Sequence, residues 1–130
     1  MLASIHWLRV LIAGVLSEVG VIVVLLASIA IYKQFVAAAM SEARSGTLGE
    51  RVGYYVAPTA GFVTTGLAAL WAVRGLETGV IANAVAVGIV SVAVTFPFLL
   101  SAKPEHRLMY GVAFALRLIA AYLAGVISRP

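Results

Sequence analysis

Residues 10–32 read VLIAGVLSEVGVIVVLLASIAIY, an apolar run broken only by Ser17, Glu18 and Ser28. At about 1.5 Å per residue, a helix of this length spans the roughly 30 Å of hydrocarbon in a bilayer. Residues 28–30 resemble the small-residue cleavage site of a signal peptide, but the apolar run is longer than the roughly 7–15-residue core of such peptides. We therefore predict that this stretch forms a transmembrane helix.

The composition of the whole chain agrees with a membrane environment. The 130 residues are 63% hydrophobic and only 11% charged, which is too little charge to cover the surface of a soluble domain. The chain has no cysteine, so disulfides and thiolate-bound metals are excluded. Its basic residues lie mostly at the ends of apolar segments, where they anchor helices at headgroups. They form no stripe interleaved with aromatics, so no nucleic-acid partner is predicted.

Three further apolar segments follow the first, at residues 54–73, 79–100 and 108–127. Each is long enough to cross a bilayer as a helix. We predict an all-α fold: a single membrane domain over residues 1–130, built as an integral membrane bundle of four antiparallel transmembrane helices with up-down topology.

Residues 33–53 form the sizeable hydrophilic stretch of the chain and are predicted to be a loop. Its first part, up to Arg44, is rich in helix formers and is expected to extend the first helix beyond the bilayer. Ser45-Gly46 is expected to end that extension. Thr47 and Glu50 then fit a capping box, so the second helix is predicted to begin near Leu48.

The distribution of basic residues predicts the orientation. With four spans, both chain ends and the turn at 74–78 share one side of the membrane. The other side carries more Lys and Arg, so loops 33–53 and 101–107 are predicted to be cytoplasmic. The basic residues counted are Arg9, Arg74 and Arg129 on one side, and Lys33, Arg44, Arg51, Lys103 and Arg107 on the other. The expected location is the bacterial inner (plasma) membrane.

Glu18 and Arg117 are charged residues well inside predicted spans. Charges at that depth are costly, so each is expected to have a partner and to be a functional candidate. Glu18 lies about nine residues into its helix, or ~13 Å, and Arg117 lies about eleven residues from the same face, or ~16 Å. Since the two helices are predicted to be antiparallel, the depths match and the side chains can form an ion pair.

Other polar residues fall near the same depth. Thr64 and Thr65 are predicted to lie at the level of the ion pair, and Asn83 at the edge of that layer nearer the surface. One interpretation is a structural ion pair that fixes helix register. Another is a proton- or ligand-linked site, because a buried carboxylate beside a cation can change protonation when a competing cation arrives. A third places Arg117 at an interface with another subunit.

Catalytic and cofactor chemistry find little support in the sequence. His6 and His106 are predicted at opposite membrane faces, roughly 30 Å apart, so they are not expected to share a haem or a metal. The chain has neither a nucleophile elbow nor a phosphate-cradling glycine loop. We therefore predict no catalytic residue, no cofactor and no metal.

Small residues repeat at four-residue spacing in three of the predicted helices, a pattern that lets helix backbones approach closely within one chain or between chains. A homodimer or a larger membrane complex is therefore a candidate assembly. The pairs are Gly61 and Thr65, Ala84 and Gly88, Gly111 and Ala115, and Ala121 and Gly125.

Residues 14–20, which read GVLSEVG, resemble the first helix of small multidrug resistance transporters. The resemblance implies a four-helix chain that works as a dimer and exchanges protons for cationic aromatic substrates at the residue matching Glu18. The loop after helix one is longer here, and Arg117 would compete with a cationic substrate. More broadly, the chain resembles uncharacterised small bacterial four-transmembrane-helix proteins with an N-terminal Arg and a helix-one Glu.

Three functions follow from these patterns. The first is a non-enzymatic membrane protein that acts as a structural, accessory or assembly partner. The alternative is a proton-coupled small-molecule transporter or binding protein that uses Glu18. The second alternative is a membrane enzyme acting on a lipid, with basic residues of the loops 33–53 and 101–107 holding phosphates.

Overall fold

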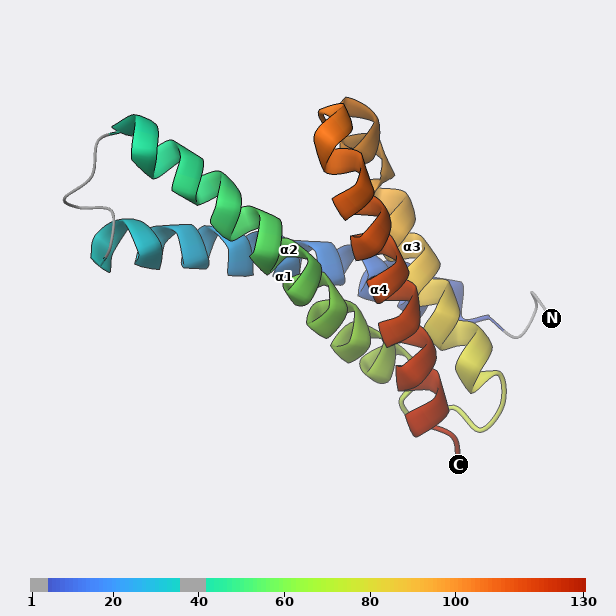
Figure 1. Cartoon of the computed structure of the whole chain (residues 1–130). Coiled ribbons are helices and arrows are strands. Elements are labelled where there is room, and N and C mark those ends of the chain that lie inside the picture. The colour runs from blue at the N-terminus through green and yellow to red at the C-terminus, as the bar shows by residue number, and fades with distance from the viewer. Residues whose placement is uncertain (1–4, 36–41) are drawn as a thin grey trace.

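The computed structural model describes residues 5–35 and 42–130 and is all-α. Four long helices are joined in the order α1 (Trp7–Phe35), α2 (Glu42–Val73), α3 (Val80–Ser101) and α4 (Arg107–Ile127), with a short 3-10 helix, η3 (Pro104–His106), before α4 (Figure 1). Four helical segments are long and apolar enough to cross a membrane. Those segments are Trp7–Gln34, Tyr54–Val73, Val80–Ser101 and Pro104–Ile127, and the four expected spans overlap them.

The predicted start of the second helix near Leu48 is wrong by six residues, because α2 begins at Glu42 and the expected capping residues Thr47 and Glu50 lie inside it. Arg44 belongs to α2, and Ser45-Gly46 lies inside this helix instead of ending its predecessor. Each of the three glycines in this stretch, Gly46, Gly49 and Gly53, lowers helix stability by about 1 kcal/mol, and the helix formers between them, among them Leu48 and Glu50, oppose that loss. The predicted extension of the first helix through residues 36–41 lies outside the described residues.

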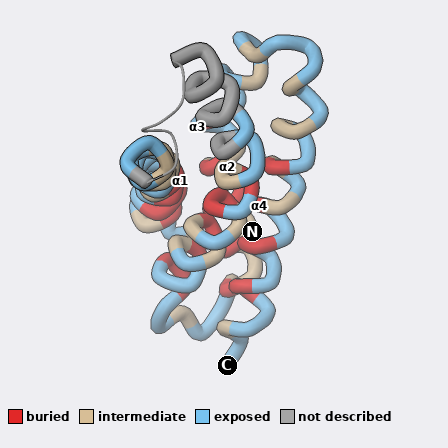
Figure 2. Tube along the Cα trace, turned by 60° about the vertical axis from the view of Figure 1, so that its left-hand side comes forward, coloured by how far each residue is buried: buried red, intermediate tan, exposed pale blue. Residues whose placement is uncertain are grey.

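The helices do not all run alongside one another. Helices α3 and α4 lie side by side, whereas α1 crosses the other helices, and its Phe35 end lies beside the start of α2, away from α3 and α4 (Figure 1). Helix α1 packs on α2 and α3, and α4 packs on the same two helices. Buried residues gather in the middle of the molecule, where these packings meet (Figure 2). That central region holds the polar residues described below.

The interior is made of small side chains. Among the described residues, every buried hydrophobic residue is an alanine or a valine, with Val10, Val87 and Ala121 fully buried. Large aliphatic and aromatic side chains point outward instead, as Leu26 and Phe98 do. A water-soluble core would bury leucine, isoleucine and phenylalanine first. This inverted pattern is typical of helices that associate by close packing within lipid.

The small-residue pairs predicted on α3 and α4 divide into two groups. Gly88 of α3 faces Ala121 of α4, and a Cβ added to Gly88 would lie 2.8 Å from the Ala121 Cβ. Gly125 faces Ala84 in the same way, at 3.0 Å. The two pairs therefore pack against each other and bring α3 and α4 together. Gly111, in contrast, lies on the exposed side of α4 with nothing within 4 Å of an added Cβ.

Candidate functional site

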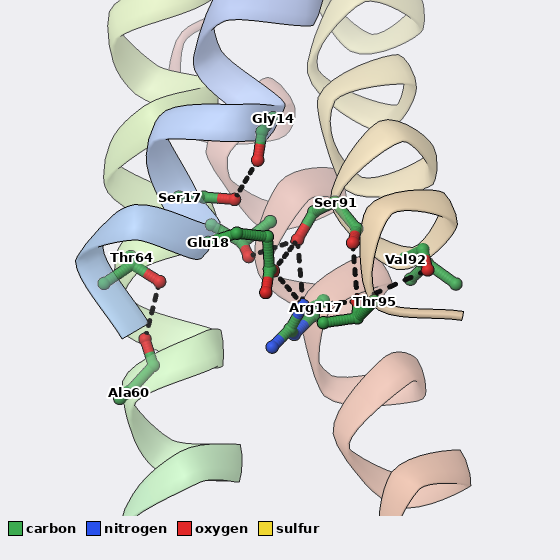
Figure 3. A network of polar contacts seen from close by, with 10 residues as sticks. Gly14, Ser17, Glu18, Ala60, Thr64, Ser91, Val92, Thr95 and Arg117 are labelled. Carbon is green, nitrogen blue, oxygen red and sulfur yellow. Dashed lines mark hydrogen bonds and ion pairs between the residues drawn. The ribbon is translucent and has the colours of Figure 1, made fainter. Parts of the chain in front are cut away.

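The two buried charges meet at the centre of the molecule. Glu18 on α1 is 7% exposed and Arg117 on α4 is 4% exposed. Arg117 Nη1 donates a hydrogen bond to Glu18 Oε1 and forms an ion pair with it (Figure 3). The contact joins helices that are otherwise separated by α2 and α3. Each charge thus neutralises the other in an interior that has little water to solvate either one.

Helix α3 supplies two hydroxyl groups to the ion pair, from Ser91 and Thr95. Ser91 Oγ donates to Glu18 Oε1 at 2.8 Å. Arg117 Nη1 donates to Thr95 Oγ1 at 2.9 Å and to Ser91 Oγ at 3.2 Å. Both hydroxyls face the pair because residues four apart lie on one helix face. The sequence interpretation missed them, although two hydroxyl residues at i and i+4 in an apolar helix were a usable signal.

Helix α2 completes the network through Thr65, which is fully buried with its Oγ1 3.3 Å from Ser91 Oγ. Since the single hydroxyl proton of Ser91 goes to Glu18, Thr65 is the donor of this bond. Thr95 in turn donates to the Ser91 carbonyl oxygen at 2.6 Å. All four long helices therefore contribute to what we call the central network: Glu18, Thr65, Ser91, Thr95 and Arg117.

Two of the predicted polar residues lie outside the central network. Thr64 donates to the Ala60 carbonyl oxygen of its own helix at 2.8 Å. Asn83 donates from Nδ2 to the Gly79 carbonyl oxygen at 2.8 Å and accepts from the His6 backbone N–H at 2.7 Å. The Asn83 amide therefore ties the start of α3 to the start of α1 instead of lying at the edge of the charged layer.

The guanidinium of Arg117 uses only part of its hydrogen-bonding capacity. Among the described residues, all of its hydrogen bonds leave from Nη1. Its Nε is buried and has no hydrogen-bond partner. Gly61 of α2 lies beside this edge: an added Cβ would lie 2.8 Å from Nε and 3.1 Å from Nη2. The absence of a side chain at Gly61 is what lets the guanidinium fit between α2 and α4.

A pocket of about 430 Å³ adjoins the network on the side of Arg117. It is bounded by α2, α3, η3 and α4, and reaches from Thr95 and Arg117 to Lys103 and His106. The His106 ring lies 6.2 Å from the Tyr54 ring, centroid to centroid, and both line the pocket. Glu18 is not among the described lining residues, so a molecule in the pocket meets the cation of the pair.

Metal-binding groups are not gathered anywhere in the described ranges 5–35 and 42–130, where no three His, Cys, Asp or Glu residues lie close enough to hold an ion. His6 and His106 belong to different surroundings: His6 adjoins Asn83, and His106 adjoins Tyr54. The functional groups of the central network are hydroxyls, one carboxylate and one guanidinium. This set favours binding an anion or holding an ion pair.

Comparison with known proteins found no matching family model, no matching curated protein and no matching solved structure. The central network and the pocket beside it are therefore the features of this chain that bear on its function.

Proposed function

We propose that this chain is a small, non-enzymatic protein of the bacterial inner membrane that acts as a structural or accessory partner in a membrane assembly. The observation that carries the proposal is the central network, to which all four long helices contribute a side chain. Such a network fixes the register and rotation of every helix at once. A bundle held in this way presents a fixed outer surface to other membrane proteins.

The hydrogen bonds that Glu18 accepts support a structural role for this residue over cation exchange. Its Oε1 accepts hydrogen bonds from both Arg117 and Ser91. A cationic substrate would have to displace Arg117, which is 4% exposed, and leave that charge without a partner in a low-dielectric interior. Removing one member of a buried pair typically destabilises a protein by about 3–5 kcal/mol. Each exchange of a cation at Glu18 would have to overcome a free-energy cost of similar size.

Insertion in the bilayer accounts for the rest of the surface. In the proposed arrangement the helices alternate in direction, the network lies near the middle of the membrane, and the bulky outward side chains contact lipid. The described connections between spans are short, at residues 74–79 and 102–106. A partner, whether a second copy or another membrane protein, would therefore meet this chain mainly through the sides of its helices.

A thermodynamic cycle on the ion pair tests the structural role. We expect Glu18→Gln and Arg117→Met each to lower the stability of the purified protein by about 3–5 kcal/mol, because each leaves one buried charge unpaired. The double mutant should recover most of that loss, since no charge remains. Thermal unfolding in one detergent measures all four proteins. Additive losses would contradict the structural role of the pair.

Cross-linking in native membranes tests the accessory role. We expect a photo-reactive residue at Leu123, an outward position on α4 that is 44% exposed, to capture a discrete protein band before solubilisation. The matched control is a photo-reactive residue at Ala121, which is fully buried on the same helix. Capture at neither Leu123 nor outward positions of the other helices would argue against an assembly partner.

A second candidate, a membrane protein that binds or moves a small molecule, is favoured by one observation, the pocket that touches Arg117. In this function Glu18 would respond to the occupant indirectly, because the occupant meets the guanidinium first. Glu18→Gln would then abolish ligand-linked changes while the protein stays folded.

A further inference from the structure

Arg117 has hydrogen-bond donors that the protein does not use. A guanidinium carries five N–H donors in a planar fork. In Arg117 only Nη1 donates to other described residues, and the buried Nε has no partner. A buried donor without a partner costs about 1–3 kcal/mol. Nη2 also makes no hydrogen bond to a described residue, so its N–H groups remain able to donate to an oxygen of a carboxylate or phosphate.

Nε is packed against the α2 backbone at Gly61, so the donors that can face a ligand are those of Nη2. A Cβ added at Gly61 would lie 2.8 Å from Nε and 3.1 Å from Nη2, so this packing requires a residue without a side chain. The pocket beside Arg117 has a volume of about 430 Å³, which lies within the roughly 300–1,000 Å³ of pockets that hold small molecules. Arg117 therefore adjoins a space large enough for a ligand.

The lining of the pocket selects for a particular kind of molecule. Its charged members are Arg117 at the inner end and Lys103 at the outer end, and none of the described lining residues is acidic. Between these ends the walls are apolar and aromatic, formed by side chains that include Tyr54, Met109, Tyr110 and Phe114. Two cationic ends with an apolar wall between them fit an anion that also carries a hydrophobic part.

We propose that this pocket binds an amphiphilic anion, with a carboxylate or phosphate group on the unused Nη2 donors of Arg117 and an apolar body against the aromatic wall. The ligand leaves the ion pair with Glu18 in place, because it uses donors that Glu18 does not. Both a free organic acid and an acidic lipid carry this chemistry. The inference is independent of whether the chain has a protein partner.

Binding is tested on the full chain in nanodiscs of phosphatidylcholine. The probes are decanoate and decyl phosphate, with decyltrimethylammonium and decanol as partners of matched chain length, and empty nanodiscs correct for partitioning. We expect saturable binding and a raised unfolding temperature with the two anions alone. Equal binding of the cation or the alcohol would overturn the proposal, because the pocket would then recognise only the alkyl chain of the probe.

Two further arms identify the source of the anion. Benzoate, which partitions little into lipid, tests a free organic acid. Nanodiscs doped with phosphatidylglycerol test an anionic lipid, which should then compete with decanoate. A positive result in either arm supports the proposal and assigns the source. Failure of both arms, together with failure of decanoate and decyl phosphate, overturns it.

Variants locate the site. Ala113 lines the pocket, so Ala113→Leu should fill it and weaken decanoate binding by about tenfold or more, equivalent to about 1.4 kcal/mol. Ala115→Leu, at an exposed position on the same helix outside the pocket lining, should bind as the parent does. Equal affinities in these two variants would place the ligand elsewhere.

The outer cation offers a test that does not disturb the interior. Lys103 is exposed and lines the pocket, whereas Arg107, also exposed, does not line it. We expect Lys103→Gln to weaken decanoate binding by about threefold, as exposed charge pairs typically do, and Arg107→Gln to leave it unchanged. If both substitutions weaken binding equally, the anion is attracted by the general positive charge of the surface, and a defined site is contradicted.

Discussion

At the scale of single residues, Arg117 connects the two features that distinguish this protein. Its Nη1 reaches Glu18, Ser91 and Thr95, and its other edge lies against Gly61. The guanidinium is therefore held on one side by hydrogen bonds and on the other by the van der Waals surface of a helix backbone. A side chain clamped in this manner has little freedom to move when a neighbour grows.

Gly61→Ala tests that clamp. The new Cβ would lie 2.8 Å from Arg117 Nε, so we expect a loss of stability of about 1–3 kcal/mol from overpacking. The matched control is Gly66→Ala on the same helix, where the new Cβ would meet the Ala120 Cβ at an ordinary 3.7 Å. That variant should be neutral or stabilised by up to about 1 kcal/mol. Thermal unfolding in detergent compares them.

The effect should depend on the guanidinium itself. In an Arg117→Met background, the flexible methionine can yield to the added methyl group. The penalty of Gly61→Ala should therefore shrink to within about 0.5 kcal/mol of the Gly66→Ala result in that background. A penalty that persists would mean that the glycine is required by backbone packing and not by Arg117.

The sequence predicted part of the central network. The pairing of Glu18 with Arg117 followed from depth alone, because charges inside spans need partners and the two residues lie at matching depths. Depth does not specify rotation about the helix axis, which is why Thr64 was expected beside Thr65 yet bonds its own backbone. Ser91 and Thr95 were missed because hydroxyl residues in apolar helices commonly bond their own carbonyl groups.

At the scale of helices, the contact between α3 and α4 depends on the absence of side-chain volume. Ala84 and Gly88 lie against Ala121 and Gly125, with no space for a further methyl group between Gly88 and Ala121.

The C-terminal end of α2 is capped by a side chain of α1. Arg9 Nη2 donates to the carbonyl oxygens of Trp71 at 3.3 Å and Arg74 at 3.2 Å. Helix ends carry carbonyl groups without helical partners, and a cation satisfies them.

Gly88→Ala tests the close approach of α3 and α4. The two Cβ atoms would lie 2.8 Å apart and both are fixed to backbones, so the helices must separate. We expect a loss of about 1–3 kcal/mol. Gly111→Ala on α4 serves as the control, because nothing lies within 4 Å of its Cβ, and it should be neutral or gain about 0.5–1 kcal/mol. Similar unfolding temperatures for the two variants would refute the close contact.

The four apolar spans could be predicted from the sequence, but the start of α2 could not. Long apolar runs define spans through length and composition alone, so the four segments stood out. The start of α2 at Glu42 was missed because Ser45-Gly46 reads locally as a helix end. Helix formation is cooperative, so the helix formers around Gly46, Gly49 and Gly53 let α2 continue through these weak positions.

At the scale of the whole molecule, the placement of the two ends of the bundle is a prediction from charge. Lys103 and Arg107 lie at one end and are assigned to the cytoplasm by the positive-inside rule, whereas Glu77 lies in the opposite turn. The proposed up-down arrangement requires these two ends to lie on opposite sides of the membrane.

Cysteine labelling measures that arrangement directly, because the natural chain has no cysteine. In intact spheroplasts, we expect Glu77→Cys to react with a membrane-impermeant maleimide and Lys103→Cys to react only after lysis. Glu77 and Lys103 are both exposed, so neither substitution should disturb packing. The reverse pattern would invert the orientation, and partial labelling at both sites would indicate dual insertion. Full labelling of both from outside would contradict the up-down arrangement.

The interior of alanine, valine, glycine and hydroxyl residues has a consequence for how this chain tolerates amino-acid changes. In a water-soluble protein, bulky core positions resist substitution and the surface varies freely. Here the bulky residues face outward, where one large aliphatic side chain serves as well as another. The inward positions, such as Gly88 and Ala121, admit almost nothing larger. A saturation mutagenesis map of this protein should therefore show intolerant sites at its small inward-facing residues, in addition to Glu18 and Arg117, and tolerant sites at its large outward-facing ones.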